Sequence, residues 1–139
     1  MMTLDFATQI AQAAFAEGRV RGVLNMSVVV VDVGGSLRLA MRADGQGIFG
    51  IDIARAKATT ALGFNCSTLQ LAQAFSDPAK VAALSGATNG VFLPIGGGVL
   101  VQGASGVTLG AAAVAGGAPE VDEAIIVAAI RAAGLTVPP

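Results

Sequence analysis

The chain is organised around Ser27–Gly45, SVVVVDVGGSLRLAMRADG. A run of valines is followed by a turn with two glycines and then by a strand that mixes apolar and basic residues, a pattern that predicts a β-hairpin. The valines do not alternate with polar residues, so both faces of their strand should be covered and the strand should lie in the centre of a sheet. The hairpin ends in the loop Arg42–Gly45, which leads into a predicted helix.

The turn of the hairpin determines which residues face each other. A three-residue loop closed by a left-handed Gly35 places Asp32 opposite Ser36, where its carboxylate can accept hydrogen bonds from turn amides. We therefore interpret Asp32 as a turn former rather than a catalytic acid. In this register the side chains divide into two faces, one with Val29, Val31, Leu37, Leu39 and Met41, and one with Val28, Val30, Arg38, Ala40 and Arg42.

The remaining elements follow from capping residues and apolar patterns. Thr3 should cap a first helix that Gly18 ends in the left-handed conformation. Further helices are predicted over Ile51–Phe64, Thr68–Phe75, Pro78–Leu84 and from Pro119 to the stop at Gly134. Strands are predicted over Val91–Pro94, Val99–Gln102 and Val107–Val114. The last strand has only small side chains, which predicts that a helix or a second subunit approaches it closely.

The composition sets broad limits on the class of protein. The 139 residues suffice for one domain, residues 1–139, with its own core, and 54% of them are hydrophobic. Eight Lys and Arg against nine Asp and Glu give a net charge of −1, which argues against a nucleic-acid partner. So low a charge favours a surface partly covered by other subunits, and we expect a homo-oligomer.

Sequence features also favour a cytoplasmic location and no membrane association. The amino terminus lacks the basic and apolar regions of a signal peptide, and the single cysteine, Cys66, suits a reducing compartment. No charged residue occurs between Lys80 and Glu120, but Gly86–Gly117 holds ten of the 19 glycines. Such a segment favours short strands and turns over a membrane-spanning helix.

Three charged residues form the candidate catalytic set: Lys57, Arg42 and Asp44. Lys57 falls on the apolar half of the predicted helix Ile51–Phe64, where it either extends past the sheet edge or reaches an anionic group in a cleft. A desolvated lysine can act as a base or form an imine, and an arginine can clamp a carboxylate. We expect the loop Arg42–Gly45 to lie near the lysine.

Other motifs indicate what the chain does not contain. Gly96-Gly97-Gly98 lacks the residues of a phosphate-binding loop, but its backbone can approach a ligand or a strand closely. Without histidine there is no ordinary zinc site and no Ser-His-Asp system, and no metal site is predicted. Cys66 is interpreted as a packed small residue rather than a nucleophile. The acids Glu120, Asp122 and Glu123 are explained by the start of a helix, with a catalytic or metal role as the alternative.

Taken together, the motifs resemble those of the GlcG/HbpS-like family, which also occurs as the C-terminal domain of PduO-type adenosyltransferases. The resemblance covers essentially the whole chain. It rests on five segments of the sequence: Val31–Gly35, Arg42–Gly45, Ala54–Ala61, Gly97-Gly98 and Pro119–Glu123.

The resemblance implies an α/β (α+β) domain, roughly profilin-like, with a central antiparallel sheet of about five strands and helices on both faces. It implies assembly into oligomers, which we expect to range from tetramer to octamer. Some relatives bind or help degrade haem, so haem or a related tetrapyrrole is the candidate cofactor, with Gly97 and Gly98 as cofactor-binding residues. Since the chain has no histidine and no tyrosine, Met and Cys66 are the remaining axial ligands of usual type.

Three hypotheses for the function follow. The first is an oligomeric small-ligand-binding protein of the GlcG/HbpS-like type. The alternative is a cofactor-independent enzyme of lyase, isomerase or hydratase type that acts on a small carbonyl or carboxylate metabolite in a catabolic pathway, through Lys57, Arg42 and Asp44. The third is a structural or accessory subunit.

Overall fold

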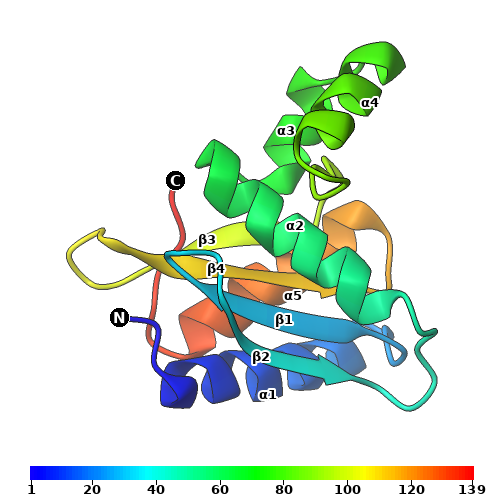
Figure 1. Ribbon diagram of the computed structural model, residues 1–139. Coiled ribbons are helices and arrows are strands. Elements are labelled where there is room, and N and C mark those ends of the chain that lie inside the picture. Colours follow the sequence, from blue (N-terminus) through cyan, green and yellow to red (C-terminus); the bar gives the residue numbers. More distant parts are fainter.

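The computed structural model describes residues 1–139 and contains one antiparallel sheet with helices on both faces (Figure 1). The helices are α1 (Leu4–Val20), α2 (Gly50–Phe64), α3 (Thr68–Ala74), α4 (Pro78–Ala87) and α5 (Pro119–Ala132). The strands are β1 (Ser27–Asp32), β2 (Leu37–Arg42), β3 (Gly98–Gln102) and β4 (Thr108–Ala115), in the order β2-β1-β4-β3. The predicted fold class is confirmed, with four strands in place of about five.

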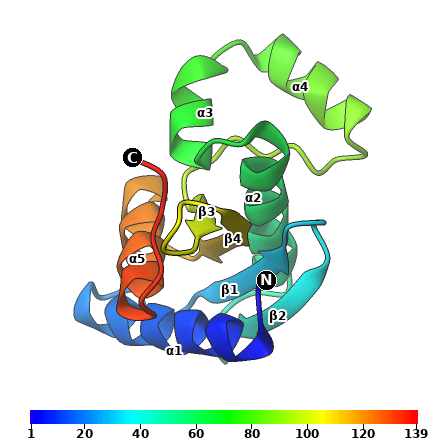
Figure 2. The ribbon, with the colours of Figure 1, turned by 90° about the vertical axis from the view of Figure 1, so that its left-hand side faces the viewer.

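Strand β1 lies in the interior of the sheet between β2 and β4, as its valine run predicts. On one face Val28 and Val30 pack with α1 and α5, and on the other Val29 and Val31 pack with α2 (Figure 2). Helix α2 also contacts the alanines of β4, which confirms that a helix approaches the small-residue strand closely. None of the five helices is both long and apolar enough to cross a membrane.

The β1–β2 turn has the predicted register. Asp32 N–H donates to the Ser36 carbonyl at 2.9 Å, and Gly35 is left-handed with φ 81°. One carboxylate oxygen of Asp32 accepts from the amides of Gly34 and Ser36, both at 3.0 Å. Asp32 therefore holds the turn through two hydrogen bonds.

Replacing Asp32 with alanine should lower the free energy of unfolding by about 1 kcal/mol, since both turn amides lose their acceptor. Asp32→Asn keeps a carbonyl oxygen at the same place, so its free energy of unfolding should fall by less. Urea unfolding of the two variants measures the difference. Equal losses would mean that the side-chain oxygen does not hold the turn.

The predicted division of β2 into two faces is wrong. Val31 pairs with Leu37 and Val30 with Leu39, so Arg38 is the extra residue of a β-bulge. A bulge moves every later side chain to the other face of the sheet. Leu39 thus packs with the Val28 and Val30 side of the core, and Ala40 with the opposite side.

Gly18 does not end the first helix. Helix α1 continues to Val20, and the left-handed residue after it is Gly22, with φ 76°. Gly18 is buried inside the helix, where a Cβ would lie 2.7 Å from the carbonyl oxygen of Val23. This glycine is required for close packing rather than for a turn.

Val91–Pro94 does not form a strand. The hydroxyl of Thr60, on α2, donates to the Val91 carbonyl at 3.0 Å and accepts from the Leu93 amide at 2.9 Å. A side chain thus takes the place of a strand partner, and Pro94 has no N–H with which to extend a ladder. This is why the sheet has four strands.

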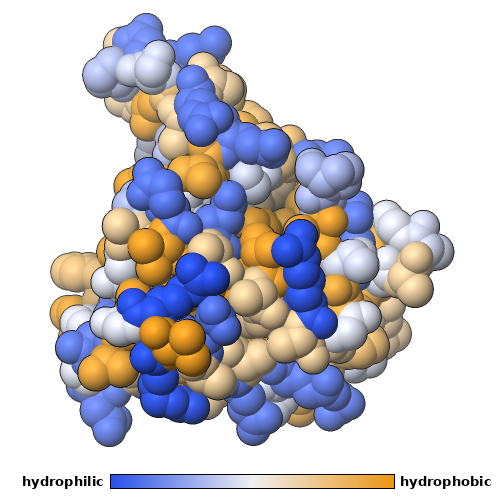
Figure 3. All heavy atoms as spheres, turned by 180° about the vertical axis from the view of Figure 1, so that it is seen from behind, coloured by the Kyte–Doolittle hydropathy of each residue, from blue (hydrophilic) through white to orange (hydrophobic).

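Helices α3 and α4 project from the sheet as an arm (Figure 1). None of the residues of α4 is buried. The base of the arm is held by three phenylalanines, Phe64, Phe75 and Phe92, whose ring centroids lie 4.9–6.0 Å apart. On the face seen from behind, apolar side chains occupy much of the middle and strongly hydrophilic ones stand among them (Figure 3).

Candidate functional site

Lys57 is buried in the centre of the molecule. Helix α2 directs its side chain, which is 4% exposed, toward the start of α5, where Nζ lies 3.2 Å from a carboxylate oxygen of Asp122. Nζ also donates to the carbonyl of Val114 at 3.1 Å. Burial lowers the pKa of the Lys57 ammonium, and the charge and hydrogen bond of Asp122 oppose this shift. The lysine therefore reaches an anionic group in the core and does not extend past the sheet edge.

Asp122 is 1% exposed and has three hydrogen-bond donors around its carboxylate. Besides Lys57, it accepts hydrogen bonds from the amides of Gly116 at 3.2 Å and Gly117 at 2.8 Å. The start of a helix therefore does not by itself explain this acid. It joins α2 to the turn between β4 and α5.

Gly97 and Gly98 lie against Lys57, so the structure brings these three candidate residues together. A Cβ on Gly97, whose φ is 131°, would lie 2.9 Å from Lys57 Nζ and 2.6 Å from the Val114 carbonyl oxygen. A Cβ on Gly98 would collide with the backbone carbonyl of Lys57. These two glycines allow α2 to lie close to β3.

Arg42 and Asp44 lie elsewhere. They line a hollow of about 480 Å³ at the end of the hairpin, which we call the Arg42 hollow, together with Arg19, Asn25 and Met41 among others. Arg42 donates to the carbonyl of Gln46 at 3.2 Å. Neither residue forms a hydrogen bond or ion pair with Lys57, whose polar partners are Asp122 and Val114.

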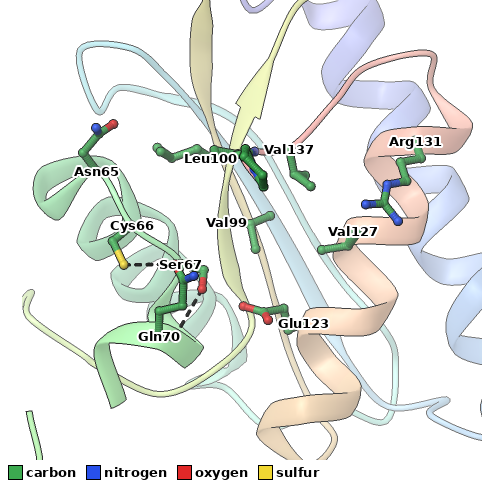
Figure 4. A pocket seen from close by; sticks show the side chains of 12 residues that line it. Asn65, Cys66, Ser67, Gln70, Val99, Leu100, Glu123, Val127, Arg131 and Val137 are labelled. Atoms are coloured by element: carbon green, nitrogen blue, oxygen red, sulfur yellow. Dashed lines mark hydrogen bonds between the residues drawn. The ribbon is translucent and has the colours of Figure 1, made fainter. Parts of the chain in front are cut away.

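A pocket of about 380 Å³ lies between α5, β3 and the turn that joins α2 to α3 (Figure 4); we call it the α5–β3 pocket. Asn65, left-handed with φ 52°, ends α2, and Ser67 starts α3 by accepting a hydrogen bond from the Gln70 amide at 3.2 Å. These residues form the polar wall. The apolar wall consists of Val99, Leu100, Val127, Val137, Pro138 and Pro139.

Glu123 lies on the floor of this pocket, with its carboxylate pointing toward Ser67 (Figure 4). Its Oε1 atom is buried. Burial raises the pKa of the Glu123 carboxyl, while hydrogen bonds to this carboxyl from the Ser67 hydroxyl and the Leu69 backbone N–H oppose the shift.

Two further polar side chains line the pocket. Cys66 is half-buried in the turn between α2 and α3, and its thiol donates to the side-chain oxygen of Gln70 at 3.2 Å. Arg131 is exposed and forms neither a hydrogen bond nor an ion pair. The pocket therefore combines an acid, a free guanidinium and apolar walls, and its volume falls within the range of about 300–1,000 Å³ of small-molecule sites.

The residues of this pocket were not predicted from the sequence to form one site. Glu123, Val127 and Arg131 are spaced four residues apart, so their common helix face was visible in the sequence. The elements that pack against this helix face could not be predicted from the sequence, because β3 and the turn after α2 are separated from α5 along the chain.

The raised pKa of Glu123 predicts a pH dependence of stability. Between its ordinary value of 4.5 and the raised value, the folded protein binds more protons than the unfolded chain. The free energy of unfolding contributed by this group therefore falls as the pH rises through that window, and below the window there is no loss. Urea unfolding at a series of pH values should show this fall in the wild type and a weaker one in Glu123→Gln. The same slope in both proteins would contradict the prediction.

The comparisons with known proteins point to one family. A family model described as haem-degrading protein HbpS-like matches residues 2–131. The comparison with curated proteins gave no match.

Three solved structures resemble this one along most of its length. Streptomyces reticuli HbpS, as a double mutant, is 31% identical with a TM-score of 0.79, over 94% of this chain and 85% of its own. Klebsiella pneumoniae ORFY is 26% identical with a TM-score of 0.86, over 96% and 90%. PduOC, whose structure was solved as a complex with haem, is 24% identical with a TM-score of 0.85, over 96% of both chains.

Proposed function

Because the chain belongs to the HbpS-like family of haem-degrading proteins, we propose that it binds a small ligand, and that the ligand occupies the α5–β3 pocket. The observation that carries this proposal is the pocket itself, in which the carboxyl group of Glu123 and the exposed guanidinium of Arg131 border an apolar wall.

The composition of the pocket supports the same proposal. Apolar side chains cover one wall, and a few polar groups converge at one end, which is the usual arrangement in small-molecule sites. Family membership adds support, because a related domain, PduOC, has been solved with haem.

Haem is a second candidate ligand. A haem iron in a protein is held by His, Cys, Met or Tyr, and this chain has no His and no Tyr. Cys66 is the one side chain of these types in the α5–β3 pocket, and Met41 lies in the Arg42 hollow. The residues present do not fit a histidine-held haem, so a haem in this pocket would be held through Cys66.

We favour binding over the catalytic alternative because of the position of Lys57. A lysine that acts as a base or forms an imine must meet its substrate. Here Nζ contacts Asp122 and Val114, and the side chain is 4% exposed. We propose that Lys57 holds α2 to the start of α5, and that Arg42 and Asp44 belong to a separate surface.

A variant in which a large side chain fills the α5–β3 pocket tests the proposal that this pocket binds the ligand. Val127→Trp should fill the α5–β3 pocket, while Ala132→Trp, at an exposed position on the same helix, serves as the control. A fragment library screened by ligand-observed NMR should give fragments that bind the wild type and the control but not Val127→Trp. Binding that is the same in all three proteins, or no binding at all, would overturn the proposal.

Titration with haemin tests the second candidate. A saturable shift of the Soret band that is lost in Cys66→Ala and kept in Met41→Leu would support haem in the α5–β3 pocket. Absence of a saturable shift would exclude haem as the ligand, and a shift lost only in Met41→Leu would place it in the Arg42 hollow.

A further inference from the structure

The charges of the α5–β3 pocket lie on one face of α5. Glu123, Val127 and Arg131 follow one another at four-residue spacing, so they lie in a row along the helix. Eight residues of helix span about 12 Å. The acid and the guanidinium therefore stand at opposite ends of the row, with an apolar side chain between them.

Arg131 is a cation without a counter-ion. It forms no ion pair, although the protein contains nine acidic residues. In Figure 4 its side chain lies on the Val127 side of the pocket, away from Glu123 and Ser67. A guanidinium is a rigid fork of donors whose geometry matches a carboxylate, and such hydrogen bonds are stronger than those between neutral groups.

The other end of the pocket carries an acceptor. The carboxyl group of Glu123 lines this end, and an ammonium or hydroxyl group of a ligand can donate to it. The middle of the pocket is apolar, with Val99, Val127 and Val137 on its walls. An alkyl chain of about six carbons with a hydrogen bond of about 3 Å at each end is comparable in length to the rise of about 12 Å between the two helix positions.

On the premise of the proposed function, we infer that the ligand is a carboxylate with an apolar body and a hydrogen-bond donor at its far end. Its carboxylate contacts Arg131, its body lies against the valines, and its amino or hydroxyl group donates to Glu123. This assigns Arg131 and Glu123 as the residues that select the ligand and determine its direction in the pocket.

Four probes of equal chain length separate the contributions of the two ends: aminocaproate, caproate, hexylamine and hexanol. Calorimetric titration of the wild type should give the tightest binding for aminocaproate. Arg131→Gln should lower the affinity for aminocaproate and caproate by about tenfold and leave the affinity for hexylamine unchanged, since only the first two have a carboxylate. Glu123→Gln should lower the affinity for aminocaproate and hexylamine and leave the affinity for caproate unchanged. Arg55→Gln, at an exposed arginine on α2, is the control and should change none of them.

The outcomes distinguish this inference from the proposed function. One outcome is that hexanol and hexylamine bind the wild type but not Val127→Trp, while Arg131→Gln binds caproate as tightly as the wild type does. In that case the assignment of the carboxylate to Arg131 is wrong, but the pocket remains a binding site. If none of the probes binds and the fragment screen is also negative, both proposals are wrong.

Discussion

Replacing Lys57 with methionine is expected to lower the free energy of unfolding by about 3–5 kcal/mol, because it leaves a buried carboxylate without its counter-charge. Asp122 is 1% exposed, and Lys57 Nζ at 3.2 Å is the cation beside it. Methionine fills the volume of the lysine stem, so the loss reports the missing charge and not a cavity. Urea unfolding followed by far-UV circular dichroism measures it.

Two further variants make this prediction specific. In Lys57→Met with Asp122→Asn, the neutral amide can still accept from Gly116 or Gly117, so part of the lost stability should return. Arg55→Ala, on the exposed side of the same helix, should change the stability by no more than about 0.5 kcal/mol. If Lys57→Met is as mild as Arg55→Ala, the buried pair does not stabilise the fold.

Gly98→Ala is expected to destabilise the protein by about 3 kcal/mol, at the upper end of the usual range for overpacking. The added Cβ would collide with the backbone carbonyl of Lys57 and would lie 2.7 Å from its carbonyl carbon. A helix backbone cannot move aside as a flexible side chain can, so α2 would have to shift away from β3. Thermal unfolding with chemical denaturation as a second method measures the loss.

Gly63→Ala is the matched control, with the opposite sign. Gly63 lies inside α2, and a Cβ there meets nothing within 4 Å. Alanine is favoured over glycine in a helix by roughly 0.5–1 kcal/mol, so this variant should be more stable than the wild type. A loss of stability in Gly63→Ala, or none in Gly98→Ala, would contradict the close-packing role of the glycines.

Local features of the structure could be predicted from the sequence because their causes lie within a few residues. The turn at Asp32 and Gly35 depends on a side chain and on amides two and four residues away. The predicted cap at Thr3 is confirmed for the same reason, and Ser67 and Asp77 cap α3 and α4 through equally local hydrogen bonds. The family resemblance is confirmed as well, since it rests on motifs spread over the whole chain.

Predictions failed mostly where a distant neighbour determined the local structure. Gly18 was predicted to end a helix, but α1 continues to Val20 and the left-handed residue is Gly22, so this failure is one of local helix length. Val91–Pro94 resembles a strand, but its polar groups bond to Thr60 on another element. The bulge at Arg38 reversed the faces of β2, because strand register depends on pairing and not on one strand alone.

The candidate site shows the same division. From the sequence, Lys57 was visible as a lysine on an apolar helix face, and its neighbour was expected in the loop Arg42–Gly45. In the structure the neighbour is Asp122, 65 residues away, and the α5–β3 pocket around Glu123 is assembled from several separate segments of the chain.

The helices and the central hairpin could be predicted from the sequence, since they follow from propensities and caps that act over short distances, and the family could be predicted from motifs along the whole chain. Which charges are buried, which are paired and which face a pocket became visible only in the folded molecule. The physical reason is that the energy of a charge depends on the distance to its partners and on its exposure to water, and chain folding sets both.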